Sequence, residues 1–253
     1  MSGRARIRAL GSWFLCLVWL VSAWAQTPAK QAAEPTTADQ ILDRFLEAEG
    51  GRAAFEKLTS RVMTGTVSVP SMSLTGTVEL REKAPDRSLG IITINGASYR
   101  QGFDGTSGWT DDPQNGLRDL TGTELAEIRR ESDFYHTLDL RKLYAKFTLT
   151  GKQEIGERET YVVEAVATEG GPPEKMYFDV ASGLLVRNTS QRHGPDGVSE
   201  FLQEYDDYRK IDGIQLPQTI RQTNEGTLVV ITVTAYHHNV PLDDADFSKP
   251  TVP

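Results

Sequence analysis

The chain has 253 residues, with 27 Lys and Arg against 35 Asp and Glu, which gives a formal net charge of −8 at pH 7. This acidic balance makes nucleic acids and anionic membrane surfaces poor partners, because both repel negative charge. The single cysteine, Cys16, excludes a disulfide framework. Its place near the N-terminus leaves the rest of the chain without a thiol nucleophile or a cysteine-based metal site.

Residues 1–25 have the pattern of a secretory signal peptide. Arg4, Arg6 and Arg8 precede a short apolar run, and Ala23-Trp24-Ala25 provides a small-x-small cleavage site. The apolar run is shorter than the roughly 20 residues that span a bilayer. Since an exported chain without disulfides fits a bacterial periplasm, we predict a periplasmic protein whose net charge after cleavage is about −11.

The chain after the predicted cleavage site divides into a linker and one domain. Residues 26–37 are rich in Ala, Pro, Thr and Gln, which is typical of a loose linker, and residues 38–253 suit a single domain. Thr37 and Gln40 form a capping-box pattern that predicts a helix at the start of this domain. Gly50-Gly51 is expected to end this helix, and a shorter helix follows.

The segment from Arg61 to Lys83 contains the phrase Thr-Gly-Thr-Val twice and predicts a β-hairpin that turns at Pro70-Ser71. This turn places Gly65 opposite Gly76, and the neighbouring glycines indicate a close approach by another group or a sharp bend. Side chains that face each other across an antiparallel pair share one face of the sheet. The apolar face of this hairpin is expected to consist of Met63, Gly65, Val67, Val69, Met72, Leu74, Gly76, Val78 and Leu80.

The remaining chain has about ten strand-like runs at hairpin spacing, among them two runs joined at Asn95-Gly96. A helical insertion is predicted from Glu124 to Leu143, with a second capping box at Thr121. From Lys146 onward every predicted element is a strand. This order predicts a mainly β (α+β) fold, in which one large antiparallel sheet curls and helices cover one of its faces.

No catalytic motif is present in the sequence. There is no Gly-x-Ser-x-Gly, no His-Glu-x-x-His and no phosphate-binding loop. His237 and His238 are adjacent on a strand, so their side chains point to opposite faces, and the acidic tail that follows is interpreted as solvated. We therefore predict no catalytic residue, no metal site, no cofactor and no enzymatic activity.

Four phrases carry a resemblance to a known family. They are Glu47-Ala-Glu-Gly-Gly51, the run from Gly102 to Trp109, Tyr177-Phe-Asp-Val-Ala-Ser-Gly-Leu-Leu-Val-Arg187, and the run from Tyr205 to Pro217. In this order, between Ala38 and Pro250, they resemble the LolA/LolB-like periplasmic lipoprotein carriers, and within them the outer-membrane lipoprotein-sorting proteins. The resemblance implies an incomplete antiparallel β-barrel of about eleven strands, with a helical lid and an apolar cavity for acyl chains.

The expected ligand-binding residues combine this resemblance with the hairpin. They are the apolar hairpin face named above together with Ile91, Phe103, Trp109, Leu125 and Ile128 as further wall or lid residues. A chain of about 16 carbons buried at roughly 0.8 kcal/mol per CH2 would gain on the order of 12 kcal/mol before entropy costs. The expected partners are therefore acyl chains of lipids or lipoproteins, bound by a monomer that contacts the membrane only transiently.

Two alternatives stay open from the sequence. One is an envelope sensor or protein-interaction domain on the same fold, which would need an envelope protein as partner. The other is a lipid-ester hydrolase, against which the missing nucleophile motif and the scattered histidines count.

Overall fold

The computed structural model describes residues 34–194 and 197–251. The predicted signal peptide, with Cys16, and most of the predicted linker lie outside these residues. The helices and strands belong to one unit that begins at Pro35. Among the described residues, none of the helices combines the length and the apolar character that crossing a membrane requires.

The helices of the described residues fall into two groups, as predicted. Their bounds are α1 Ala38–Glu49, α2 Arg52–Phe55, α3 Gly122–Glu131 and α4 His136–Leu143, with 3-10 turns η1 Pro70–Met72 and η2 Asp244–Phe247. Thr37 caps α1 with the predicted capping box, and Gly50 ends it at φ 136°. Thr121 makes no side-chain capping bond at α3; Glu124 instead accepts two hydrogen bonds from Arg118, at 2.7 and 2.8 Å.

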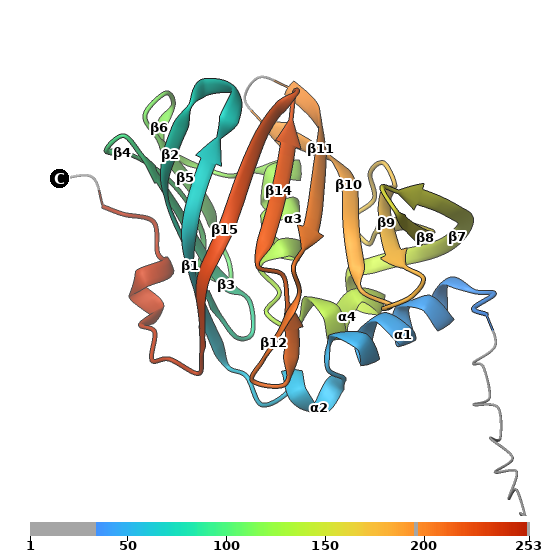
Figure 1. The fold of residues 1–253 in the computed structure, drawn as a ribbon. Coiled ribbons are helices and arrows are strands. Elements are labelled where there is room, and N and C mark those ends of the chain that lie inside the picture. The colour runs from blue at the N-terminus through green and yellow to red at the C-terminus, as the bar shows by residue number, and fades with distance from the viewer. Residues whose placement is uncertain (1–33, 195–196, 252–253) are drawn as a thin grey trace, which may run out of the picture. The chain divides into compact units, whose positions relative to one another are not determined.

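Strands make up most of the remaining described chain (Figure 1). Their bounds are β1 Ser60–Val69, β2 Leu74–Lys83, β3 Arg87–Ile94, β4 Ala97–Phe103, β5 Gly108–Asp112, β6 Gly116–Asp119, β7 Tyr144–Ile155, β8 Arg158–Ala167, β9 Glu174–Asp179, β10 Leu185–Gly194, β11 Gly197–Asp206, β12 Arg209–Ile211, β13 Ile214–Leu216, β14 Thr219–Asn224 and β15 Thr227–His238.

Thirteen of these strands form one antiparallel sheet in the order β6-β5-β4-β3-β2-β1-β15-β14-β11-β10-β9-β8-β7, and β12 and β13 pair separately. The sheet is open, because its end strands β6 and β7 do not pair with each other. The family resemblance implied about eleven strands. The sheet has thirteen. One strand that contributes to this difference is β6. Asp112 accepts hydrogen bonds from the backbone N–H groups of Gln114 and Asn115 and so closes a tight turn that leads into β6.

The hairpin of β1 and β2 has a different register from the predicted one. Gly65 lies opposite Val78 and Gly76 opposite Val67, which is a shift of two residues that keeps the same side chains on the apolar face. The shift arises because η1 and Ser73, at φ 53°, make a longer connection than a turn at Pro70-Ser71. The two glycines are therefore diagonal, and each has a valine across from it.

Both glycines mark places where another strand comes close. A Cβ on Gly65 would lie 2.5 Å from the carbonyl oxygen of Thr232, where the pairing of β1 with β15 contains an irregularity between Thr64 and Gly65. A Cβ on Gly76 would lie 2.0 Å from the carbonyl oxygen of Thr93 on β3. The sequence left open a close approach or a bend, and the structure has close backbone approach at both positions.

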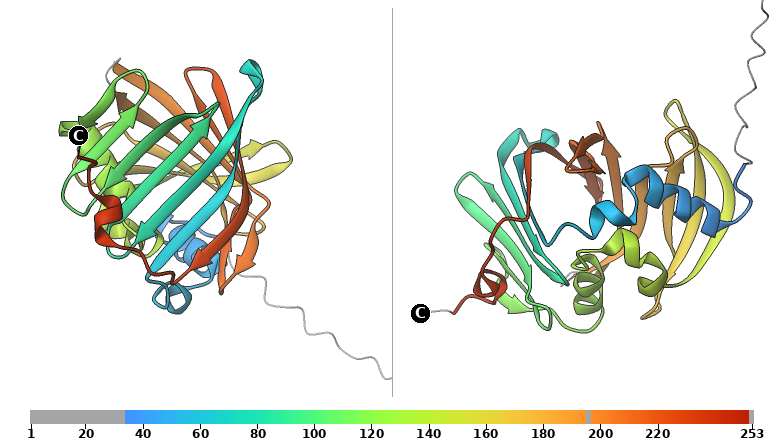
Figure 2. Two further views of the ribbon diagram at one scale, coloured as in Figure 1. Left: turned by 90° about the vertical axis from the view of Figure 1, so that its left-hand side faces the viewer. Right: turned by 90° about the horizontal axis from the view of Figure 1, so that it is seen from below.

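The helices occupy the concave side of the sheet (Figure 2). α1 packs Ile41, Leu42 and Phe45 against strands β8 and β9, and the Phe45 and Phe178 rings lie 5.1 Å apart. At the opposite end, α3 packs Ile128 against Phe103 and Leu120. Helices thus fill both ends of the concave side, and the middle is left for a cavity.

The C-terminal segment lies on the convex side, over β2, β3 and β5 (Figure 2, left). Phe247 is fully buried against Leu89 and Trp109. Asp244 forms ion pairs with Lys83 at 2.6 Å and Arg87 at 3.3 Å. This acidic tail was predicted to be solvated; it is instead anchored, because the strands beneath it present lysine and arginine side chains.

Candidate ligand cavity

A cavity of about 1100 Å³ lies in the middle of the concave side. Its wall is formed by strands β1 to β5 on one side and by β9, β10, β11, β14 and β15 on the other, with α3 and α4 beside it. A volume of this size is slightly above the usual range for small-molecule sites, about 300–1000 Å³. The cavity is therefore large enough for an amphiphile.

One part of this wall is an apolar strip that crosses five neighbouring strands. It contains Met63 on β1, Val78 and Leu80 on β2, Ile92 on β3, Ile231 on β15 and Ile220 on β14. Within each half of the sheet these residues are cross-strand neighbours, with Met63 opposite Leu80, Val78 opposite Ile92, and Ile220 opposite Ile231. The strip is continuous across β1 and β15 because all six side chains pack in one hydrophobic cluster.

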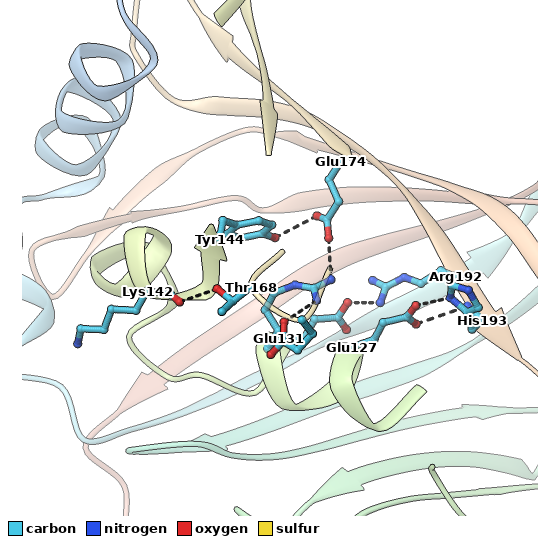
Figure 3. A network of polar contacts seen from close by, with 10 residues as sticks. Glu127, Glu131, Lys142, Tyr144, Thr168, Glu174, Arg192 and His193 are labelled. Carbon is cyan, nitrogen blue, oxygen red and sulfur yellow. Dashed lines mark hydrogen bonds and ion pairs between the residues drawn. The ribbon is translucent and has the colours of Figure 1, made fainter. Parts of the chain in front are cut away.

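The opposite part of the wall is charged, and its residues bind one another (Figure 3). Glu127 and Glu131 lie four residues apart on α3 and therefore face the same way, toward β10. There Glu131 pairs with Arg192, and Glu127 Oε1 lies 2.6 Å from His193 Nδ1. These contacts attach α3 to strand β10 across the cavity.

A second group of contacts attaches the same helix to β9. Arg130 donates a hydrogen bond of 2.6 Å to Glu174, and the Tyr144 hydroxyl donates one of 3.0 Å to the other oxygen of the same carboxylate. Burial raises the pKa of the Tyr144 hydroxyl, which therefore stays protonated. Burial also lowers the pKa of His136 to about 4, so this cavity-lining imidazole is neutral near pH 7.

The sequence-predicted residues divide between the cavity and its surroundings. The cavity lining contains Met63, Val78, Leu80 and Ile128. Ile91 borders the cavity, but its side chain packs against the Leu89 and Trp109 cluster on the convex side, and the neighbouring Ile92 faces the cavity instead. Val67, Phe103 and Val69 are buried elsewhere, and Leu125 packs beside Phe103. Gly65, Leu74 and Gly76 also lie outside the lining, and Met72 is 59% exposed near the hairpin tip. The prediction for Met72 is corrected, because η1 carries it away from the paired strands.

Trp109 is on the opposite face of the sheet from the expected one. Gly108 faces α3, where a Cβ would lie 2.9 Å from Ile128, so the next side chain along β5 points to the convex side. There the Trp109 indole is 1% exposed and its Nε1–H donates a hydrogen bond of 2.9 Å to the carbonyl oxygen of Phe247. The prediction that Trp109 belongs to the cavity wall or lid is therefore corrected.

The charged wall was missed from the sequence. Arg130, Glu131, Glu174 and Arg192 belong to one helix and two strands that are distant in sequence, and no local motif connects them. The available signal was the spacing of polar residues in β10, where Asn188, Ser190 and Arg192 alternate with outward residues. This spacing shows that they share a face, but not that the face is concave.

A buried carboxylate lies at the C-terminal end of α1. Glu49 Oε2 is buried without a hydrogen-bond partner in the described chain, and the nearby Thr137 and Arg61 lower the pKa of the carboxyl group only in part. Burial raises the pKa of Glu49 from 4.5 to about 7. Since the carboxylate is disfavoured here, its protonation couples folding to pH.

The Glu49→Gln variant is expected to be more stable than the wild type above pH 7, and this advantage should shrink as pH falls to 4.5. Between pH 4.5 and about 7 the folded chain holds a proton that the unfolded chain has lost, so wild-type stability falls as pH rises. The expected change across this window is about 1–3 kcal/mol, measured by urea unfolding at several pH values. Glu47→Gln, on an exposed position of α1, is the matched control and should show no such change. A constant difference between Glu49→Gln and the wild type would contradict the prediction.

No family model matches the sequence, and no curated protein matches it. Solved structures do match. A LolA superfamily protein from Nitrosomonas europaea is 15% identical, with a TM-score of 0.54, and the match covers 85% of this chain and 99% of that chain. An outer membrane lipoprotein-sorting protein domain from Vibrio parahaemolyticus is 13% identical, with a TM-score of 0.54, and 83% and 97% of the two chains are covered.

This chain has a LolA-like fold. A DUF1329 family protein from Desulfovibrio piger supports the same assignment, at 16% identity and a TM-score of 0.53, with 83% of this chain and 96% of that chain covered. The LolA-like fold predicted from the sequence, mainly β with an open antiparallel sheet and helices on its concave side, is thereby confirmed. At these identities the likeness concerns the fold alone.

Proposed function

We propose that this protein is a non-catalytic periplasmic carrier that binds acyl chains of lipids or lipoproteins in its cavity. The observation that carries the proposal is the continuous apolar strip from β3 to β14, which offers an acyl chain a wall on which to bury its methylene groups. Met63 in this strip has a flexible side chain that can adapt to chains of different length. Handing over such cargo would require only transient contact with a membrane.

The Leu80→Glu variant tests this proposal. Leu80 is half-buried and faces the cavity, so a carboxylate there can be solvated in the empty cavity but would lose its water under an acyl chain. We expect fatty-acid affinity to fall at least about 30-fold, which corresponds to about 2 kcal/mol. The measurement is displacement of a fluorescent C16 fatty acid, together with native mass spectrometry of protein purified gently from the periplasm.

Thr77→Glu is the matched control, since Thr77 is exposed on the same strand and faces the convex side. It should bind the fatty acid as the wild type does. A wild-type protein that binds no acyl chain, or a Leu80→Glu variant that binds it unchanged, would refute the carrier function.

The alternative, a protein-interaction role on the same fold, has one observation in its favour. Strand β7 is at the end of the sheet, and most of its side chains are exposed. Such an edge presents backbone groups to which a strand of another protein can pair. A stoichiometric protein partner that Leu80→Glu still binds would favour this role over the carrier.

A further inference from the structure

Three carboxamides form a row across neighbouring strands on the cavity wall. Asn188 on β10 lies directly opposite Gln203 on β11, and Gln203 lies directly opposite Gln222 on β14. All three line the cavity. Direct cross-strand neighbours have Cβ atoms about 4.5–5.5 Å apart, so the three amide groups form one surface about three strands wide.

The amide groups of this carboxamide row are unused within the described chain. No hydrogen bond of the described residues involves any of their side-chain nitrogens or oxygens, and Asn188 Oδ1 is buried without a partner. Buried polar groups in folded proteins are almost always hydrogen-bonded, and leaving one unpaired costs about 1–3 kcal/mol. An unused, partly buried row of this kind is therefore suited to a ligand that supplies the missing bonds.

The arginines of the wall, in contrast, are already paired with carboxylates. Each lining arginine pairs with a carboxylate: Arg61 with Glu82, Arg100 with Asp111, Arg130 with Glu174, and Arg192 with Glu131. A phosphate or sulfate headgroup would have to break one of these pairs and leave a carboxylate unpaired in the cavity. A quaternary ammonium would have to displace an arginine to reach Glu82, Glu131 or Glu174.

We infer that the cavity binds an amphiphile with an uncharged, polyhydroxyl headgroup, which hydrogen-bonds to the carboxamide row of Asn188, Gln203 and Gln222. Each carboxamide both donates and accepts hydrogen bonds, as each hydroxyl of a sugar or glycerol group does. Within the cavity lining, Ile220 lies two residues before Gln222 on β14 and therefore on the same face, so the head and the chain of one molecule can reach the row and the apolar strip together. This inference rests on the proposed carrier function and adds the class of headgroup.

The test compares ligands that share a C12 chain and differ in the head: dodecyl maltoside, dodecyl sulfate, dodecyltrimethylammonium and 1-dodecanol. Calorimetric titration with the monomeric amphiphiles should give dodecyl maltoside the highest affinity of the four. The Gln203→Met variant keeps the side-chain length but removes the amide. It should bind dodecyl maltoside roughly 3- to 10-fold more weakly, the range for one or two neutral hydrogen bonds, and dodecanol with unchanged affinity.

Two further variants complete the design. Gln222→Met should show the same selective loss, which makes the test independent of how well one variant folds. Gln191→Met is the matched control, because Gln191 is an exposed glutamine on β10 that faces the convex side. It should bind all four amphiphiles as the wild type does.

The outcomes separate the two proposals. Charged heads that bind as tightly as the maltoside, or a Gln203→Met variant that weakens every ligand equally, would overturn the headgroup inference while the acyl-chain site stands. Binding of the maltoside without binding of dodecanol would instead overturn the acyl-chain carrier and leave the headgroup site. If none of the four amphiphiles binds, both the carrier function and the headgroup inference are refuted.

Discussion

The Trp109→Ala variant should lose about 3–5 kcal/mol of unfolding free energy, the range for removing a fully buried aromatic side chain. The indole packs between Leu89 of β3 and Phe247 of the C-terminal segment, and its N–H binds the Phe247 carbonyl. Removing it leaves a cavity beneath the segment and an unpaired carbonyl above it. Chemical denaturation monitored by far-UV circular dichroism measures the loss.

Phe247→Ala provides the matched test of the same contact. If the C-terminal segment is anchored through these two rings, the double variant Trp109→Ala with Phe247→Ala should be clearly less destabilised than the sum of the single variants. Additive effects, or a Trp109→Ala variant within about 1 kcal/mol of the wild type, would contradict the packing described for the convex face.

The Gly76→Ala variant should be destabilised by about 3 kcal/mol, the upper end of the usual range for overpacking. The added methyl group would lie 2.0 Å from the Thr93 carbonyl oxygen and 2.9 Å from Ile94 Cγ1. Since the first of these atoms belongs to the backbone of the paired strand β3, relief requires the two strands to separate. The unfolding free energy in urea measures the effect.

Gly90→Ala is the control for this variant. Gly90 is also a strand glycine, on β3, but a Cβ there would have no neighbour nearer than 4.0 Å. Its replacement should be neutral or stabilising by up to about 1 kcal/mol, because alanine has less conformational entropy to lose on folding. Equal destabilisation by both substitutions would show that the close approach at Gly76 is not the cause.

The elements of the fold were predictable because their signals are local. A capping box with Gly50-Gly51 marked α1, and Asn95-Gly96 marked the turn between β3 and β4. The face of each residue in the first hairpin was also predictable, since alternation survives a two-residue shift. The register itself was not, because it depends on the conformation of residues 70–73 rather than on the repeated phrase.

The cavity was predictable only in its apolar half. A run of Val, Leu and Ile at every second position indicates a buried face, and the hairpin residues of the strip were found in this way. Trp109 was predicted on the wrong face because a buried aromatic side chain on a strand can point to either face of the sheet. Its contact with Phe247, 138 residues away in the sequence, determines that it points to the convex face. The charged wall and the carboxamide row depend on pairings between distant strands that no single segment of the sequence specifies.

The pairing of β1 with β15 has a consequence for how this chain acquires its structure. Thr64 and Thr234, which lie together in that pair, are separated by 170 residues, and the two halves of the large sheet meet there. Such a topology closes slowly, since a long loop must be ordered before the distant strands stabilise each other. Until the C-terminal hairpin arrives, β1 presents an unpaired edge, so a newly made chain passes through a stage in which it is open to association with its own copies.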